Sequence, residues 1–245
     1  EQITAGAFRL EEAVAEGRDG RVAGRIRLSV NRIKQAQRVG NAAWPGHVVP
    51  ARQVINQRAL VAEMVDAGCD YAFMEVSSHA VHQKRISGLE CAVAVFTNIT
   101  HDPLDYHGTF ANYLAAKKAF FDHLSPRAYA LINADDRRGN VMVQNTRAEV
   151  RRFSLQRLAD FKGKVLDNSL DGLHLEIDGM EVYTRLIGAF NASNLLAAYG
   201  VARLLGQEQV EVLQGLSALR AAEGRFDAVQ AHHKGVTGIV DYAHT

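Results

Sequence analysis

From Gln57 onward, apolar residues follow two alternating patterns, a helical spacing and short continuous runs. A helical stripe over residues 60–65 predicts a helix that Gly68 can end, because glycine readily adopts a left-handed conformation. The runs over residues 71–76 and 91–97 are apolar nearly throughout, as expected of strands covered on both faces. This alternation of helices and buried strands is typical of a parallel α/β sheet.

A second helix and strand follow. Thr109 is placed to cap a helix that runs to about Leu124, and Pro126 then stops it. The next apolar run, residues 128–132, predicts another buried strand, which ends in the polar loop 133–136.

The remainder of the chain predicts a hairpin, two helices and two more strands. Residues 172–187 alternate between apolar and polar around Asp178-Gly179, which favours a hairpin with a primed turn. Helices are predicted near residues 191–205 and 210–219, and strands near residues 226–229 and 236–241. The predicted fold class is therefore α/β, with a mostly parallel sheet flanked by helices and an antiparallel edge.

Composition excludes several classes of function. A net charge of +1 gives no overall field to attract nucleic acid, and the early arginine-rich stretch lacks interleaved aromatic residues. The longest apolar runs are short of the roughly 20 residues that span a bilayer, so no membrane association is predicted. Cys69 and Cys91 lie in apolar contexts without metal-ligand spacing, which favours reduced thiols in a cytoplasmic protein.

Polar side chains that follow apolar strands are the strongest chemical signal. The strings Met74-Glu-Val-Ser-Ser-His79 and Thr97-Asn-Ile-Thr-His-Asp-Pro-Leu-Asp-Tyr-His-Gly108 each follow a predicted strand, and Ala115-Ala-Lys117 lies on the helix after them. Ligands of open parallel sheets collect beyond the carboxyl ends of the strands, so these residues are candidates for a binding site.

Together with Phe190-Asn-x-x-Asn194-Leu-Leu-Ala-Ala and Asp241-Tyr-Ala-His-Thr245, these strings resemble the Mur ligase family in their order along the chain. Members of this family are ATP-dependent enzymes that add amino acids to the peptide stem of peptidoglycan precursors, and the branch that adds the third residue matches best. The resemblance implies a central ATPase domain over residues 57–245, with residues 1–56 as an atypical, unassigned segment. The family's C-terminal ligase domain is expected to be absent.

The resemblance also implies roles for individual residues. Glu75 corresponds to a magnesium ligand, and Lys117 to a lysine that the family carries as a carbamate, a second oxygen ligand for the metal; both are the candidate catalytic residues. The other candidates are substrate contacts (Ser77, Gln83, Arg85) and contacts to the nucleotide (Asn191, Asn194, Arg225, Asp241). The implied cofactors are ATP and Mg²⁺, and the implied substrates are UDP-N-acetylmuramoyl-dipeptide and an amino acid.

Simpler interpretations exist for several of these residues. Glu75 could cap a neighbouring helix, and Asn191 could be only a helix N-cap. Lys117 and its neighbour Lys118 point about 100° apart on a helix, so only one of them can face a crevice. Both would be read as surface lysines without the motifs upstream of them.

Two departures from the family pattern predict a loss of activity. Pro103 stands where the family has a histidine that assists a second magnesium, and proline cannot bind a metal; His101 is a poor substitute. The Gly-rich loop ending in Lys-Thr that cradles ATP phosphates is absent from the sequence. We therefore expect a truncated or rearranged N-terminus and an inactive chain.

The expected function is an ATP-dependent ligase of peptidoglycan synthesis that adds the third amino acid, meso-diaminopimelate or lysine, through an acyl phosphate. A noncatalytic remnant that still binds the UDP-muramoyl precursor is one alternative. A related amide ligase, such as a folate polyglutamate-type enzyme, is another, which Ser77, Gln83 and Arg85 disfavour because they match contacts to the UDP-muramoyl substrate.

Overall fold

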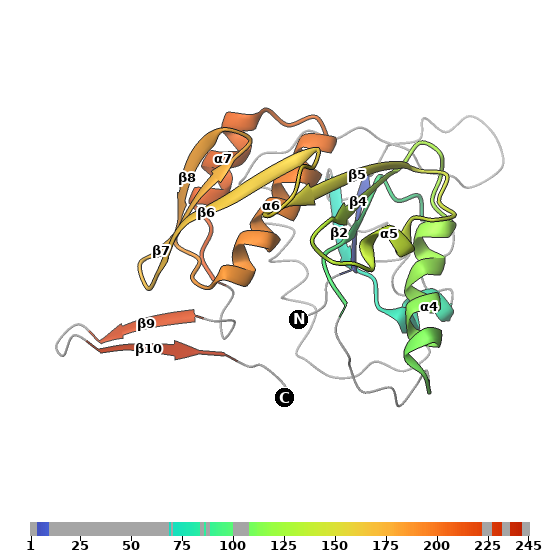
Figure 1. Cartoon of the computed structure of the whole chain (residues 1–245), viewed down its shortest axis with the longest axis horizontal. Helices are drawn as coiled ribbons and strands as arrows, with labels where there is room; N and C mark the ends of the chain where they lie inside the picture. Colours follow the sequence, from blue (N-terminus) through green and yellow to red (C-terminus); the bar gives the residue numbers. More distant parts are fainter. Residues whose placement is uncertain are drawn as a thin grey trace.

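The structure is a computed structural model that describes residues 4–9, 69, 71–83, 86, 89–99, 108–221, 227–231 and 236–241. Its strands are β1 (Thr4–Arg9), β2 (Tyr71–Glu75), β3 (Val93–Phe96), β4 (Tyr129–Asn133), β5 (Glu149–Ser154), β6 (Phe161–Ser169), β7 (Gly172–Ile177), β8 (Met180–Thr184), β9 (Asp227–Ala231) and β10 (Val236–Val240). Its helices are α3 (Ser78–His82), α4 (Phe110–Asp122), α5 (Gly139–Met142), α6 (Ala189–Leu204) and α7 (Gln209–Ser217) (Figure 1). The predicted helix over residues 60–65 lies outside the described residues.

An eight-stranded sheet with the order β2-β1-β3-β4-β5-β6-β7-β8 organises the molecule. Strands β3 to β6 run parallel to one another, whereas β7 and β8 form an antiparallel edge. The predicted α/β class and its antiparallel edge are thereby confirmed. Strand β1 lies between β2 and β3 and is antiparallel to both, a pairing that the aperiodic opening segment did not predict.

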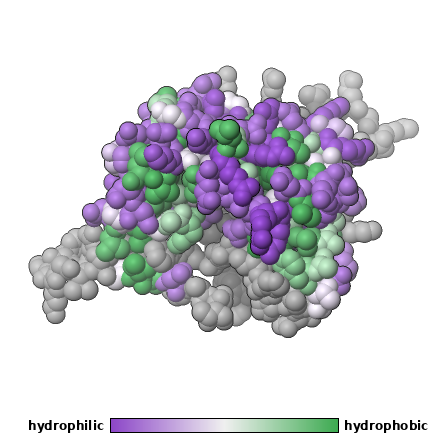
Figure 2. All heavy atoms as spheres, in the orientation of Figure 1, coloured by the Kyte–Doolittle hydropathy of each residue, from purple (hydrophilic) through white to green (hydrophobic). Residues whose placement is uncertain are grey.

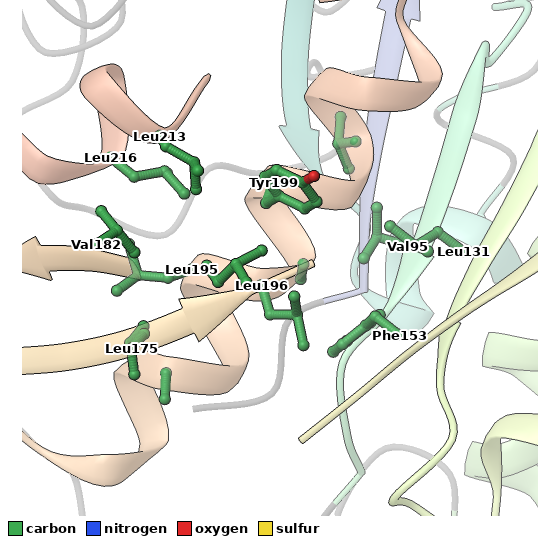
Figure 3. Close-up of a cluster of buried hydrophobic side chains, with 14 of the residues drawn as sticks. Val95, Leu131, Phe153, Leu175, Val182, Leu195, Leu196, Tyr199, Leu213 and Leu216 are labelled. Carbon is green, nitrogen blue, oxygen red and sulfur yellow. The ribbon is translucent and has the colours of Figure 1, made fainter. Parts of the chain in front are cut away.

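Both faces of the central strands are buried. On one side, Val95, Leu131 and Phe153 pack with residues of α6 and α7, which we call the α6 face (Figure 3). On the other side, Phe96 and Ile132 pack with residues of α4 and α5, which we call the α4 face. The continuous apolar runs of the sequence arise because successive side chains alternate between these two cores.

Helix α4 begins as the sequence predicts. The Thr109 hydroxyl accepts a hydrogen bond from the Asn112 amide at 3.2 Å, which satisfies a donor that the helix itself leaves free. The helix ends at Asp122, slightly before the predicted Leu124. Its buried stripe includes Tyr113, Phe120 and Phe121.

Helix α6 begins with a glycine instead of a polar cap. Gly188 occupies the N-cap position with φ 91°, so the interpretation of Asn191 as a helix N-cap is wrong. Farther along, a Cβ on Gly200 would lie 3.0 Å from the side chains of Leu131 and Phe161. This small residue therefore lets the helix approach the sheet closely.

The predicted hairpin between β7 and β8 is confirmed. Asp178 and Gly179 both have positive φ, 45° and 82°, as a type I′ turn requires. The Asp178 carboxylate accepts a hydrogen bond from the Lys162 amide at 2.8 Å. Burial and the nearby Asp178 carboxylate raise the pKa of Tyr199 to about 12. The turn is thus tied to β6 through the Lys162 amide.

Several elements were not predicted from the sequence, namely β5, β6 and the short helices α3 and α5. Strand β6 is mostly exposed after Gly163, and β5 contains the consecutive arginines Arg151 and Arg152, so neither shows a clear apolar pattern. The predicted strands near the end of the chain are present as β9 and β10, which pair with each other outside the large sheet.

Within the described part of the chain, no helix is both long and apolar enough to cross a bilayer. On the face shown in Figure 2, described hydrophobic residues form separate small groups among hydrophilic ones. The predicted cytoplasmic location and lack of nucleic-acid binding stay predictions.

Candidate functional site

The carboxyl ends of β2, β3, β4 and β5 lie at one edge of the sheet, because these strands share one direction. Glu75, Thr97, Asn133 and Ser154 stand at or directly after these ends. The sheet therefore brings Glu75, Thr97 and Asn133, which belong to polar strings noted in the sequence, to the same edge as Ser154, as expected for a ligand crevice of an open α/β sheet.

Strand β1 has the opposite orientation at this edge. Ala5 pairs with Glu75 and Thr4 with Phe96, whereas Arg9 pairs with Tyr71 at the far edge. The carboxyl end of β1 therefore lies at the edge away from Glu75.

The candidate residues after β2 lie on or beside α3. Glu75 is exposed at the end of β2, and it does not cap α3. Ser77 takes that role, since its hydroxyl accepts a hydrogen bond from the Ala80 amide at 3.1 Å. Gln83 is exposed at the C-cap of α3, and Arg85 lies outside the described residues.

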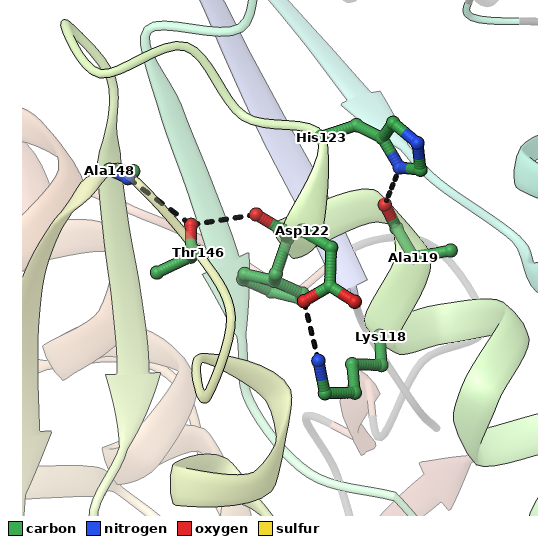
Figure 4. A network of polar contacts seen from close by, with 7 residues as sticks. Lys118, Ala119, Asp122, His123, Thr146 and Ala148 are labelled. Atoms are coloured by element: carbon green, nitrogen blue, oxygen red, sulfur yellow. Dashed lines mark hydrogen bonds and ion pairs between the residues drawn. The ribbon is translucent and has the colours of Figure 1, made fainter.

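Lys117 and Lys118 point to different partners, as their spacing on the helix predicts, although Lys118 is itself only 15% exposed. The Lys117 side chain is 4% exposed, and its ammonium nitrogen lies 5.3 Å from the centre of the Tyr113 ring. Lys118 instead pairs with Asp122 on the next turn, with its Nζ 2.5 Å from the Asp122 carboxylate (Figure 4). Lys117 is thus the lysine that faces inward, held by a cation–π contact.

Asn191 and Asn194 lie together on the first turns of α6. The Asn191 Nδ2 group donates to the Ile187 carbonyl at 2.8 Å, and the Asn194 Nδ2 group lies 3.5 Å from Asn191 Oδ1. Asp241 is exposed just after β10, and Arg225 lies outside the described residues. The structure therefore brings the two asparagines together, as their spacing on the helix predicts.

A polar loop after β4 was noted in the sequence but received no role. The Asn133 Nδ2 group donates to the Thr97 carbonyl at 2.8 Å. Asp135 accepts hydrogen bonds from the Ser154 hydroxyl at 2.6 Å and the Leu155 amide at 2.8 Å. This loop joins the ends of β3, β4 and β5, and its signal in the sequence is the polar run directly after a buried strand.

No cluster of three or more His, Cys, Asp or Glu side chains that could hold a metal ion occurs in the described ranges. Lys117, as an ammonium above a tyrosine ring, is a donor and not an oxygen ligand. Asp102, Pro103 and Asp105 lie outside the described residues.

Residues 45–202 match the family model of the Mur ligase middle domain. The chain belongs to the Mur ligase family. This confirms the family that the sequence motifs indicated. The match begins before Gln57, and the division of the chain at residue 57 stays a prediction.

Relatives within this family have one recurring name. The UDP-N-acetylmuramoyl-L-alanyl-D-glutamate–2,6-diaminopimelate ligase of Phocaeicola vulgatus is 56% identical over 199 residues, 81% of this chain and 40% of the relative. A solved structure of a ligase with the same name superposes with a TM-score of 0.69 at 29% identity, covering 78% of this chain and 40% of the other. The chain spans about 40% of the length of the curated relatives it matches.

The fold recurs in a more distant Mur ligase. The MurF ligase of Thermotoga maritima, solved in complex with ADP, superposes with a TM-score of 0.51 at 21% identity, covering 64% of this chain and 36% of the other. At this identity the likeness shows the shared fold alone.

Proposed function

We propose that the chain carries the substrate-binding part of an ATP-dependent ligase that adds 2,6-diaminopimelate to UDP-N-acetylmuramoyl-L-alanyl-D-glutamate. The observation that carries this proposal is the 56% identity over 199 residues to a ligase of that name. That name favours diaminopimelate over lysine, the other amino acid considered from the sequence. In the reaction that the family implies, ATP supplies the phosphoryl group that activates the substrate carboxylate.

The residues around α3 support precursor binding. Ser77 uses its oxygen to accept the Ala80 amide, so its hydroxyl proton is available to donate to a ligand. Gln83 is exposed at the other end of this short helix. These donors, with Arg85, suit the carboxylate and phosphate groups of a UDP-muramoyl dipeptide.

We further propose that this chain by itself binds the precursor without consuming ATP. The sequence has no Gly-rich Lys-Thr loop, and Pro103 offers no metal ligand. The described residues lack a cluster for magnesium, so we assign no step of the reaction to that ion. For a ligase that also has the phosphate loop and the metal-binding histidine, this proposal keeps the roles predicted from the sequence. These are magnesium ligands at Glu75 and Lys117 and nucleotide contacts at Asn191, Asn194, Arg225 and Asp241.

The test combines calorimetric titration with a phosphate-release assay. We expect UDP-N-acetylmuramoyl-L-alanyl-D-glutamate to bind the purified chain, and no phosphate release on addition of ATP, Mg²⁺ and diaminopimelate. Robust, substrate-dependent phosphate release would overturn the proposed lack of turnover. Binding of a folate acid in place of the precursor would instead favour the related amide ligase.

A matched pair of variants tests the substrate contacts. Gln83→Ala should weaken precursor binding by about tenfold, the effect of one lost hydrogen bond to a charged group. His82→Ala, a change at the neighbouring exposed position of α3, should leave the affinity unchanged. Equal effects of the two changes would remove Gln83 from the site.

A further inference from the structure

Strand β8 forms one edge of the eight-stranded sheet (Figure 1). Within the part of the chain that the structure describes, β8 pairs with β7 and with no other strand. An edge strand presents backbone N–H and C=O groups that can pair with a strand from another molecule. The free edge of β8 is therefore a candidate surface for such a contact.

The register of the β7–β8 hairpin determines which backbone groups face that edge. Ile177 and Met180 flank the two-residue turn, and the pair that closes such a turn exchanges both of its backbone hydrogen bonds. Bonded and non-bonded pairs alternate along the hairpin, so Val182 also bonds to β7, whereas Glu181 and Tyr183 do not. The N–H and C=O groups of Glu181 and Tyr183 consequently point away from β7, toward the free edge.

The side chains of the same two residues are exposed on one face of the sheet. Val182 packs with residues of α7 on the α6 face (Figure 3), so Glu181 and Tyr183 lie on the opposite face. Arg185 continues this two-residue spacing directly after β8 and is also exposed. A Cβ on Gly172 would lie 3.4 Å from the Arg185 Cα, so the chain still runs beside β7 at this point.

His174 on β7 holds two of these exposed side chains in place. Its Nε2 lies 2.8 Å from Glu181 Oε2, and its ring stacks on the Tyr183 ring with 3.9 Å between the ring centres. The Glu181 side chain is nevertheless 60% exposed, and a carboxylate can accept further hydrogen bonds. Side chains that are ordered before association lose less freedom when a partner binds.

The charges along this edge are complementary to a second copy of the same strand. In the sequence Glu181-Val-Tyr-Thr-Arg185, an acid and a base stand at equal distances from Tyr183. In an antiparallel pairing centred on Tyr183, each Glu181 lies opposite the other copy's Arg185, and opposite charges across a strand pair attract. A pairing centred on Glu181 would instead place two carboxylates opposite each other, which is destabilising.

We propose that two copies of this chain associate through β8, related by a two-fold axis at Tyr183. The two eight-stranded sheets would then form one continuous sheet. The centre at Tyr183 also makes bonded pairs of the residues whose backbone groups face the edge. One short strand from each copy makes a small interface, so the dimer should dissociate on dilution. This association is independent of the proposed ligase function.

Sedimentation velocity over roughly a hundredfold range of protein concentration tests the association. The wild-type chain should shift from monomer to dimer as the concentration rises. Arg185→Glu places like charges opposite each other and should raise the dissociation constant by at least about tenfold. Lys164→Glu is the matched control, because it makes the same charge change at an exposed position of β6 and should leave the dimer unchanged.

Three outcomes would overturn the proposal. A wild-type chain that stays monomeric over the whole range does not pair at β8. A dimer that Arg185→Glu leaves unchanged uses another surface. Equal weakening by Arg185→Glu and Lys164→Glu would reflect net charge instead of the strand edge.

A mixture of two charge variants tests the register of the pairing. Glu181→Arg leaves a positive charge at both positions, and Arg185→Glu leaves a negative charge at both, so each variant alone should be mainly monomeric. Their mixture should form heterodimers with about the wild-type affinity, because both cross-strand pairs regain opposite charges. Circular dichroism verifies that each variant is folded. Folded variants that form no heterodimer would contradict the pairing centred on Tyr183.

Hydrogen exchange locates the contact on the backbone. The Glu181 and Tyr183 amides should exchange severalfold more slowly at concentrations at which the dimer forms. The Val182 and Thr184 amides, which already bond to β7, should change little. Slower exchange in other parts of the chain, without a change at Glu181 and Tyr183, would place the interface elsewhere and overturn the proposal.

Discussion

The helices on the two sides of the sheet differ in what they bury. Buried residues of α6 and α7 are apolar except for Tyr199, which buries a hydroxyl. Helices α3 and α4 instead bury Ser78 and Lys117 among their apolar residues. Burying a charged group costs free energy that packing must offset.

This difference assigns separate tasks to the two faces. The α6 face stabilises the fold through packing, with Gly200 allowing the helix to lie close to Leu131 and Phe161. Beside the α4 face, Asp136 and Arg138 fix the backbone of Ile99 by hydrogen bonds. Substitutions of core residues should change global stability, and substitutions of these polar residues should act locally.

The largest effect is expected from Phe153→Ala on the α6 face. Phe153 is fully buried, and removing its ring should lower the free energy of unfolding by about 4 kcal/mol through lost burial and a residual cavity. Urea denaturation measures the change. Leu158→Ala is the control, because this side chain is 90% exposed and should change stability by less than about 0.5 kcal/mol. A loss as small as the control's would mean that this face is not the packed support.

The hydrophobic pattern of the sequence predicted only some of the strands that form the α6 face. Phe153 lies on β5, whose Arg151 and Arg152 hide the strand pattern, and Arg151 is held by Asp160 across the following loop. By contrast, β3 and β4 were predicted because both of their faces are buried, which leaves continuous apolar runs. The hydrophobic pattern of a sequence indicates which residues are buried, but it does not indicate which polar groups hydrogen-bond to each other.

The site shows the same limit. Chain order and helix spacing were enough to predict that Asn191 and Asn194 share a face and that one of Lys117 and Lys118 points inward. The contact of Arg138 with Ile99 joins residues far apart in the sequence, so no local pattern could indicate it. The pairing of β1 with β2 and β3 was equally hidden, since register across a sheet depends on tertiary contacts.

An intermediate effect is expected from Tyr199 at high pH. Its folded-state pKa of about 12 is above the ordinary value near 10, so the folded chain holds this proton more tightly. The resulting stability is fully present below pH 10 and is lost as the pH rises through 12, by at most about 3 kcal/mol. Tyr199→Phe should remove this part of the alkaline loss.

Urea denaturation at a series of pH values from 9 to 12 measures the difference between the two proteins. Tyr183→Phe is the control, because Tyr183 is 66% exposed, and it should keep the wild-type alkaline dependence. At neutral pH, Tyr199→Phe should change the free energy of unfolding by less than about 1.5 kcal/mol, because the buried ring keeps its volume. Parallel curves for wild type and Tyr199→Phe above pH 10 would contradict the raised pKa.

The smallest effect is expected on the α4 face, from Lys118→Ala. The ion pair with Asp122 joins neighbouring helical turns near solvent, so its loss should cost only about 0.3 kcal/mol and less at high salt. Thermal denaturation at low and high ionic strength measures this, with Asp122→Ala as the matching change. A loss above about 1 kcal/mol would show that ion pairs stabilise α4 globally. The ion pair would then add to the stability that the buried residues of α4 already provide.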